Sequence, residues 1–430
     1  MTQTIAQIIA REVFDSRGRP TVEVEVTSSG GITAAAIVPS GMSTGRHEAL
    51  ELRDGDPQRH AGLGVSKAVD NVRDVIAPAL MGHDLSDQAG IDAMLIELDG
   101  TSNKTRLGAN AVLGVSLAAL RVAASVARMP LWQYLDPTGR ATLPLPMVNI
   151  LSGGLHARGN VDLQDFLMVP VGARNYSEAL TVSLDVHRAT GELLSSQGQS
   201  TLKADEGGYG PKLESNRAAL DLLMQAIESA GYVPGEQIAI ALDVASSHFY
   251  SEADGRYYFR SEGRSLSADE MVQLLSEWVD DYPIVSIEDG LAEDDWDGWT
   301  RLTHRLGDRC QVLGDDLFTT NPDRLRRGIE QQAANAVLVK MNQIGTISET
   351  LNVIQLAQEA GFRTIVSARS GETEDNSLAD LAVATSAGQI KIGSVCGSER
   401  LAKYNQLLRI ESAMGDASRF AGRDALGIGH

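Results

Sequence analysis

The sequence predicts an α/β protein in which a β/α barrel follows an α+β capping domain. Three observations predict this class. A hairpin pattern and two long helical patterns precede residue 135, strand and helix patterns then alternate to about residue 410, and six of these strand patterns run into a charged residue. Such alternation is typical of a barrel of parallel strands surrounded by helices. We expect the capping domain at residues 1–135 and the barrel at residues 136–430.

The N-terminal region begins with antiparallel structure and continues with helices. TVEVEV at 21–26 alternates apolar and polar residues, SSGG follows at 28–31, and ITAAAIV at 32–38 resumes an apolar stretch, which together predict a β-hairpin. Helical periodicity marks residues 65–80 and residues 110–129. Because the second of these helices is Ala-rich and nearly apolar all round, we expect it to be buried.

The barrel region begins after a break at DPTGR (136–140) and the Pro-rich LPLPM (143–147). Strand patterns such as IVSIE and QVLGD then alternate with helical patterns such as AEDDWDGWTRLTHRL. Near residues 145–170, however, two strands, PMVNI and FLMVP, follow each other without a clear helix between them. We therefore expect a barrel that departs from a regular eightfold repeat.

Six strand patterns of the barrel region end in charged residues. In a parallel barrel the carboxyl ends of the strands meet at one rim, so these residues are predicted to converge there. The set contains three carboxylates, two lysines and an arginine: Asp243, Glu288, Asp315, Lys340, Arg369 and Lys391.

Asp243, Glu288 and Asp315 end three successive strand patterns and have no histidine or cysteine beside them. Oxygen ligands alone favour Mg²⁺ or Mn²⁺ over zinc. The alternative for each acid is a helix cap or an ion pair with a nearby base. Three acids in the same structural position, together with two lysines, favour a metal site.

Lys340 and Glu206 are the candidate general base and general acid. Lys340 ends the apolar strand AVLVK, where neighbouring metal cations would lower its proton affinity; the alternative is a structural ion pair with Asp315 or Asp316. Glu206 lies in ADEGGYGP, a glycine-containing loop that we expect to expose the acid to a cleft, although such a residue can also be a solvated turn acid.

Further candidates come from the first barrel strands and from the capping domain. His156 in SGGLHARGN, with Gln164 and Asp165 in DLQDF, is expected at the same rim, although a histidine after two glycines is often a plain loop residue. SGMSTG at 40–45, which includes Ser43, resembles a hydroxyl-rich lid able to bind a metal or phosphate. It lacks the GK[ST] ending of a phosphate-binding P-loop.

Composition excludes several classes of function. The 430 residues carry a formal net charge of −20, which disfavours nucleic acid and anionic membranes as partners. The two cysteines, Cys310 and Cys396, form neither a zinc-type pair nor a disulfide framework. The N-terminus lacks the basic start and apolar run of a signal peptide, and we expect no stretch long enough to span a bilayer. A cytoplasmic location is the simplest expectation.

Several longer segments form a recognisable set: FDSRGRPTVEVEV, SGMSTGRHEALELRDGD, GNVDLQDF, DEGGYGP, YPIVSIEDGL, GDDLFTTNP, LVKMNQIGTISET, RSGETEDNSLADLAV and AKYNQLLRIE. Through these segments the chain resembles the enolase (phosphopyruvate hydratase) family along essentially its whole length. This resemblance implies an enolase-type β/α (TIM-like) barrel, beginning ββαα, behind an N-terminal α+β capping domain. It also implies a homo-oligomer, either a homodimer or a homo-octamer.

The resemblance also implies residue roles. Asp243, Glu288 and Asp315 would hold one Mg²⁺, and a second Mg²⁺ would be bridged by substrate phosphate and the Ser43 loop. Lys340 matches the proton acceptor and Glu206 the proton donor. The remaining matches bind the substrate phosphate and carboxylate or close over them: Arg369, Ser370, Lys391, His156 and Gln164.

Several positions near the implied site depart from the family pattern. Ala368 replaces a histidine, and Arg46 or His47 is a candidate to compensate for it; Asp165 replaces the glutamate that assists the departing hydroxyl. The other departures are Met42, Ser152, Ala204 and Gly397. Because the presumed metal ligands, base and proton donor are kept, this distribution favours a pocket reshaped for another substrate.

Three functional hypotheses follow. The first is an enzyme similar to carboxyphosphonoenolpyruvate synthase, which acts in phosphonate natural-product biosynthesis on a phosphorylated or phosphono carboxylate with a nucleotide-conjugated co-substrate. The second is the glycolytic reaction, dehydration of 2-phosphoglycerate to phosphoenolpyruvate. The third is a non-catalytic binding protein, which retention of Lys340, Glu206 and the three acids disfavours.

Overall fold

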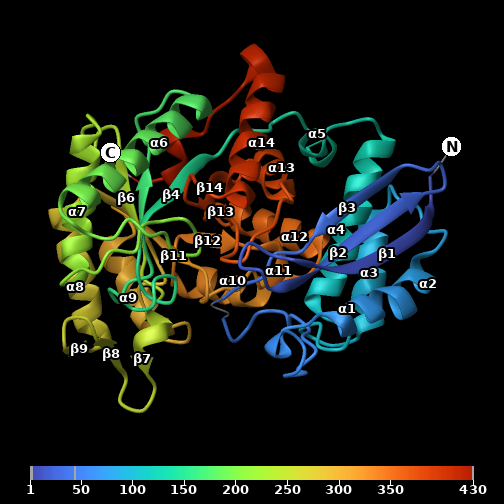
Figure 1. Ribbon diagram of the computed structural model, residues 1–430, viewed down its shortest axis with the longest axis horizontal. Helices are drawn as coiled ribbons and strands as arrows, with labels where there is room; N and C mark the ends of the chain where they lie inside the picture. The colour runs from blue at the N-terminus through green and yellow to red at the C-terminus, as the bar shows by residue number, and fades with distance from the viewer. Residues whose placement is uncertain (1–2, 43–44, 137, 429–430) are drawn as a thin grey trace.

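The computed structural model describes residues 3–42, 45–136 and 138–428. Its N-terminal part contains an antiparallel sheet of β1 (Ile5–Phe14), β2 (Pro20–Ser28) and β3 (Thr33–Ile37), at the right of Figure 1. The hairpin expected at 21–38 corresponds to β2 and β3. Strand β1 was not expected from the sequence, because it is an edge strand whose burial does not alternate regularly.

Helices of the N-terminal part cover this sheet and fill the space beside it. The segment expected to be helical at 65–80 consists of two α-helices joined by the π-helical turn Val72–Ile76. Helix α4 packs on β2 and β3. The α-helices of this part are α1 (Ser66–Asn71), α2 (Ala77–Leu80), α3 (Gln88–Asp99), α4 (Ala109–Val126) and α5 (Leu131–Leu135).

Helix α4 corrects one expectation. Its 18 residues have a mean hydropathy of 1.6, so by length and composition it could cross a membrane, which the sequence had not led us to expect. However, 83% of this stretch is buried inside the protein. A helix that is covered on nearly every side must be apolar all round, and burial explains its composition without a bilayer.

A closed eight-stranded barrel forms the second part, left and centre in Figure 1. The strands follow the order β10-β11-β12-β13-β14-β4-β5-β6. Neighbours are parallel except that β5 runs antiparallel to both β4 and β6, which accounts for the irregularity expected near 145–170. The barrel strands are β4 (Leu145–Ser152), β5 (Asp165–Val169), β6 (Ala239–Asp243), β10 (Ile284–Glu288), β11 (Gln311–Gly314), β12 (Ala336–Val339), β13 (Arg363–Ser367) and β14 (Gly388–Gly393).

Helices surround the barrel, and several begin at a side-chain cap. The side chains of Asn175, Ser215, Ser267 and Thr346 each accept a backbone N–H bond from the first turn of the helix that follows. The helices are α6 (Tyr176–Ser196), α7 (Asn216–Ser229), α8 (Ala268–Asp281), α9 (Trp296–Leu306), α10 (Pro322–Gln331), α11 (Met341–Ile344), α12 (Ile347–Glu359), α13 (Ser377–Ala384) and α14 (Ser398–Met414).

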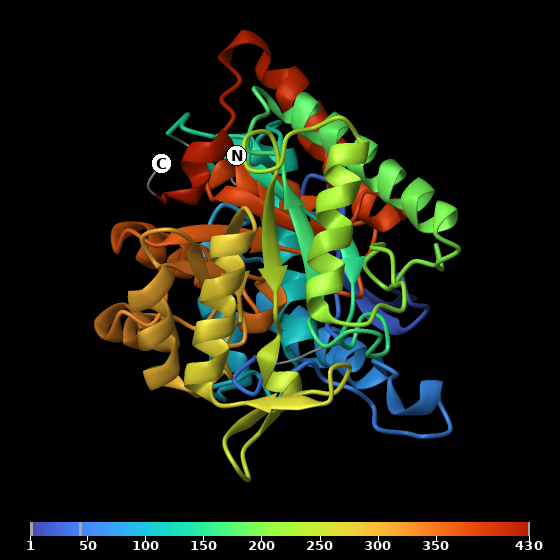
Figure 2. The same ribbon diagram turned by 90° about the vertical axis from the view of Figure 1, so that its left-hand side faces the viewer.

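The barrel interior is closed at the end opposite the strand carboxyl termini. Apolar side chains such as Leu145, Leu167 and Leu338 fill it, and Ala425 and Leu426 from the C-terminal segment pack against them. Between β6 and β10 a small sheet of β7 (Tyr250–Ser251), β8 (Arg256–Phe259) and β9 (Arg264–Leu266) projects from the barrel wall (Figure 2). Because the barrel is filled by side chains, only its carboxyl rim is available for a site.

The N-terminal part lies against this rim. Ser40 and Gly371 exchange two backbone hydrogen bonds of 2.8 and 2.9 Å, and the Ala49 N–H donates to the Gln343 carbonyl at 2.8 Å. An ion pair of 2.6 Å joins Lys104 to Glu349. These contacts hold the segment around residues 40–49 over the ends of β12 and β13.

Candidate active site

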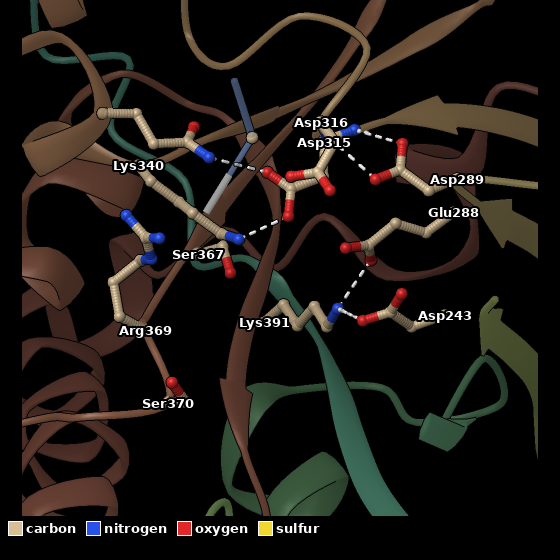
Figure 3. Close-up of polar contacts among 12 residues, drawn as sticks. Asp243, Glu288, Asp289, Asp315, Asp316, Lys340, Ser367, Arg369, Ser370 and Lys391 are labelled. Atoms are coloured by element: carbon tan, nitrogen blue, oxygen red, sulfur yellow. Dashed lines mark hydrogen bonds and ion pairs between the residues drawn. The ribbon is translucent and has the colours of Figure 1, made fainter. Parts of the chain in front are cut away.

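Lys391 lies between two carboxylates at the carboxyl rim of the barrel. Its Nζ is 2.8 Å from Oδ2 of Asp243 and 2.7 Å from Oε2 of Glu288. Figure 3 shows this bridge. Asp243 and Glu288 are paired in register at the ends of the parallel strands β6 and β10, so the barrel itself places the two acids side by side. Two buried carboxylates therefore share a single cationic group.

Lys340 follows β12 and forms an ion pair with Asp315, which follows β11. Gln343 also donates to Asp315, with a distance of 2.9 Å between Nε2 and Oδ1. Burial lowers the pKa of Lys340, but the adjacent Asp315 carboxylate outweighs burial and leaves that pKa above its ordinary value. The lowered proton affinity expected for Lys340 beside metal cations stays a prediction, and the ion pair with Asp315 that was considered as the alternative is formed in this arrangement.

Asp289 fixes the turn that carries Asp315. Its carboxylate accepts the backbone N–H groups of Asp315 and Asp316 at 3.0 and 2.8 Å (Figure 3). Asp289 itself has φ of 47°, in the left-handed region that aspartate tolerates better than most residues. Two backbone hydrogen bonds to one carboxylate leave the turn little freedom.

The buried carboxylates crowd one another. Burial, together with the negative charges of Asp243 and Asp315, raises the pKa of Glu288 well above its ordinary value. Burial and Asp315 raise the pKa of Asp316 in the same way. Hard oxygen donors that repel each other and share lysine cations fit a divalent cation such as Mg²⁺. Asp289, Asp315 and Asp316 also offer oxygens within 4.8 Å of one another.

A second group of polar residues, His156, Asp165 and Glu206, lies at the same rim. Nδ1 of His156 is 2.8 Å from Oδ2 of Asp165, and its Nε2 is 3.8 Å from Oε1 of Glu206. Burial lowers the pKa of His156, but Asp165 and Glu206 more than compensate and raise it to about 9. These three residues could also hold a metal by spacing alone. The hydrogen-bonded imidazole and carboxylate favour proton handling instead.

Glu206 lies in the loop between α6 and α7, as expected, but it is 8% exposed rather than open to a cleft. Burial raises its pKa, yet His156 and Arg400 outweigh this and leave the pKa of Glu206 below its ordinary value. The two glycines that suggested an open loop instead permit close packing. A Cβ at Gly208 would lie 2.6 Å from Oδ1 of Asn149.

Gln164 and Asp165 reach the rim because β5 is reversed. The start of β5, rather than its end, pairs with the end of β6, so that Asp165 lies opposite Asp243. Nε2 of Gln164 donates to Oδ2 of Asp243 at 3.2 Å. Its buried Oε1 has no hydrogen-bond partner among the described residues. This oxygen is a further polar group available to a cation or to a substrate donor.

Arg369 and Ser370 lie on the side of the site that faces the N-terminal part. Arg369 forms a two-pronged ion pair with Glu48, at 3.0 and 3.1 Å, and donates to Oδ1 of Asn342 at 3.0 Å. Oγ of Ser370 accepts from the Met42 N–H at 2.7 Å and from Arg17 at 3.2 Å. Residues of the N-terminal part thus hold the side chains of Arg369 and Ser370 in place.

Three further residues expected near the site, Ser43, Arg46 and His47, have other outcomes. Ser43 lies outside the described residues. Arg46 contacts Glu293 at 3.0 Å and His47 contacts Asp294 at 3.3 Å, and their role in compensating for Ala368 stays a prediction. Sequence reasoning also missed contributors to the site, although some of them adjoin residues that it did select: Arg17, Glu48, Asn149, Asp289, Asp316 and Gln343.

This fold and site define a β/α-barrel enzyme whose buried acids and lysines meet at the carboxyl rim beneath a capping domain. Comparison with protein families gives the same class. Residues 5–135 match the model of the enolase N-terminal domain, and residues 140–427 match that of the enolase C-terminal TIM barrel domain. The chain therefore belongs to the enolase family and is an enzyme of the enolase superfamily. Mg²⁺ is the cation that this family typically uses, and its substrates are small phosphorylated carboxylates.

Proposed function

We propose that this enzyme removes the α-proton of a carboxylate of the 2-phosphoglycerate or phosphoenolpyruvate type in an Mg²⁺-dependent reaction. One observation carries the proposal. Three buried acids, Asp243, Glu288 and Asp315, contact two buried lysines, Lys340 and Lys391, at the carboxyl rim of the barrel. Burying so many charges lowers stability even when they are paired, so their presence favours a function at this site. The three acids would hold one Mg²⁺, with a second bound together with substrate.

Lys340 would accept the α-proton at Nζ. Its ammonium form is held by Asp315, so base catalysis requires that the negative charge of Asp315 be engaged elsewhere. When bound, Mg²⁺ would engage that charge and stabilise the dianion formed from the substrate carboxylate. Asp289 would keep Asp315 oriented for this role through its two backbone hydrogen bonds.

Groups on the other sides would bind and protonate the substrate. Glu206 would give a proton to the departing oxygen, with His156 beside it. Arg369, Ser370 and Lys391 would bind the phosphate and carboxylate, as their match to the family pattern implies. Gln164 and Ser43 would complete the enclosure.

More specifically, we propose a reaction similar to that of carboxyphosphonoenolpyruvate synthase in phosphonate natural-product biosynthesis. Ala368 offers a methyl group that cannot bind phosphate, and the oxygens of Asp165 are occupied by neighbouring side chains. A cavity of about 600 Å³ opens beside the loops that follow β6 and β10, with Tyr250 and Glu293 among its lining residues. This space is large enough for a nucleotide-conjugated co-substrate, whose phosphates would need a cation among the carboxylates of Glu252, Glu293, Asp294 and Asp295.

The second candidate is the glycolytic dehydration of 2-phosphoglycerate. It is favoured by the retention of Glu206 and Lys340, one for each proton transfer, in buried positions at the same rim. A non-catalytic role is disfavoured by the same buried charges. For either reaction we propose a cytoplasmic enzyme that forms a homodimer or homo-octamer.

Phosphorus NMR tests these candidates. The protein is incubated with Mg²⁺ and 2-phosphoglycerate, with and without cytidylyl phosphonoformate. A new phosphonate signal that needs both substrates supports the synthase-type reaction, whereas rapid phosphoenolpyruvate formation without the co-substrate supports dehydration. No turnover in either mixture, and no exchange of the α-proton with solvent, would contradict both.

A further inference from the structure

Asp165 is fully enclosed by side chains that donate to it. One oxygen, Oδ1, accepts from Nδ2 of Asn149 at 2.5 Å and from Oγ of Ser152 at 2.8 Å. The other, Oδ2, faces Nδ1 of His156 at 2.8 Å. The exposed fraction of Asp165 is 0%. A carboxylate with three partners and no accessible surface orients its neighbours rather than contacting a substrate.

His156 is oriented by this arrangement. Because an ionised carboxylate only accepts hydrogen bonds, Nδ1 of His156 must carry the proton directed at Asp165. Nε2 is then directed at Glu206, whose Oε1 is 3.8 Å away, somewhat too far for a direct hydrogen bond. His156 thus stands between two carboxylates, one that holds it and one that faces the reacting groups.

We propose that His156, positioned by Asp165, Asn149 and Ser152, stores the proton that Glu206 delivers to the substrate. The inference rests on the proposed α-proton chemistry. At rest the Glu206 carboxylate is ionised and His156 carries the proton. The Nε2 proton of His156 passes to the Glu206 carboxylate, which hands the same proton to the departing oxygen, so that water leaves as the C–O bond breaks and Glu206 is again ionised. The resulting neutral imidazole regains a proton from solvent before the next turnover, so protons balance and no other reactant is needed. Asp165 is a positioning residue here.

The acidic groups around His156 agree with this assignment, while the cations Arg400, Lys391 and Lys340 lie toward Glu206. Asp165 on β5, Glu206 in the α6–α7 loop and Asp243 at the end of β6 all favour the protonated form of His156, and together they raise its pKa to about 9. The pKa of His248, which follows β6, shifts in the opposite direction, because burial and the charge of His156 contribute to lowering it. Below pH 9 the proton on this side of the site therefore resides on His156.

The first test is independent of any substrate. In ¹⁵N-histidine-labelled protein, His156 should titrate near pH 9, while His187, which is stacked on Tyr209 at 4.7 Å, should stay neutral down to about pH 4. Asp165→Asn should shift the His156 titration down by roughly one unit or more. Should Asp165→Asn fail to fold, Ser152→Ala removes only one hydrogen bond and should shift it less, in the same direction. An unchanged His156 titration in the folded variants would overturn the proposal.

The second test separates the two proton transfers. Exchange of the 2-phosphoglycerate α-proton with D₂O reports on Lys340, and product formation, with and without cytidylyl phosphonoformate, reports on Glu206 and His156. His156→Gln and Glu206→Gln should each retain exchange and slow product formation by about 10²-fold or more. His304→Gln, which alters an exposed histidine in the last turn of α9, is the matched control and should change neither.

The outcomes are distinguishable. Undiminished product formation by His156→Gln, or loss of exchange in that variant, would contradict the storage role. Absence of exchange in the unaltered protein would instead count against the proposed function, while the titration still decides whether Asp165 holds His156 as a cation. Asp165→Asn should also move the alkaline limb of the product pH profile to lower pH, which a purely structural role would not do.

Discussion

The two polar groups at the barrel rim differ in how their charges are held. On one side Asp243, Glu288 and Asp315 stand at the ends of neighbouring parallel strands and share lysine cations. On the other side His156 and Glu206 come from connecting segments, and a histidine cation lies between carboxylates. In the first group, termed the strand-end group, sheet register fixes Asp243 and Glu288, and the turn held by Asp289 fixes Asp315. The second, termed the loop group, depends on side-chain hydrogen bonds.

This difference teaches where change is tolerated. Barrel register places Asp243 and Glu288 directly, so moving either would require moving a strand. The loop group is held by Asn149 and Ser152, each of which a single substitution can alter. The departures from the family pattern at Ser152 and Asp165 fall on strand residues that hold the loop group, and Ala368 directly follows β13, whereas none falls on the strand-end acids. Reshaping a pocket is least disruptive there.

The largest effect should come from the strand-end group. Lys340→Ala removes the proposed base and should slow exchange of the 2-phosphoglycerate α-proton roughly 10³-fold, measured by proton NMR in D₂O with Mg²⁺. Lys104→Ala, which breaks an ion pair between the two parts of the chain, is the control and should leave exchange intact. Exchange that survives in Lys340→Ala would remove Lys340 as the base.

Metal affinity should respond next most strongly. Asp315→Asn keeps the shape of the side chain but removes one negative charge from the proposed ligand set, and it should weaken Mg²⁺ binding by about 10²-fold in calorimetric titration. The exposed Asp323 on α10 offers a matched Asp→Asn control that should bind Mg²⁺ normally. Equal affinities in both variants would take Asp315 out of the ligand set.

A smaller effect on Mg²⁺ affinity is expected for Asp289, which orients Asp315 and is not itself a proposed ligand. Asp289→Ala removes both hydrogen bonds that fix the Asp315–Asp316 turn and should weaken Mg²⁺ binding by about 10-fold, as outer-shell substitutions commonly do. The same calorimetric titration measures it. If the Mg²⁺ affinity is unchanged, contacts other than those of Asp289 hold the Asp315–Asp316 turn.

The smallest effect concerns a buried acid outside both groups. Asp380 accepts from Gln406 at 3.2 Å, and burial raises its pKa from 3.8 to about 6. Because the folded state holds this proton more tightly, Asp380 costs no stability below pH 4, and its cost grows as pH rises toward 6 and is constant above. Asp380→Asn should therefore stabilise the protein at pH 7.5 by on the order of 2 kcal/mol and by almost nothing at pH 3.5, in urea unfolding. An equal gain at both pH values would exclude titration of Asp380 as its cause.

Much of the architecture could be predicted from local patterns. The strand patterns that run into Asp243, Glu288, Asp315 and Lys340 predicted a common rim, and the structure brings these side chains into contact there. Burial of α4 followed from its apolar composition. These features depend on periodicity and on the geometry of parallel strands, both of which the sequence displays directly.

Other features depend on contacts between distant segments and could not be predicted. The ion pair between Arg369 and Glu48 joins the barrel to the N-terminal part, and no pattern near either residue indicates it. The raised pKa of Lys340 depends on the distance to Asp315, which strand order alone does not give. The antiparallel direction of β5 likewise follows from its pairing with β4 and β6 rather than from its own residues.

The seam that closes the barrel has a consequence for synthesis of the chain. Strand β14 pairs with β4, so that Gln389 lies beside Leu145. A chain emerging from the ribosome completes β4 long before β14 exists, and one edge of a fully buried strand must wait unpaired. An unpaired apolar edge is where chains associate wrongly. During translation, nascent chains of this protein should therefore need protection by chaperones until the last strand has left the ribosome.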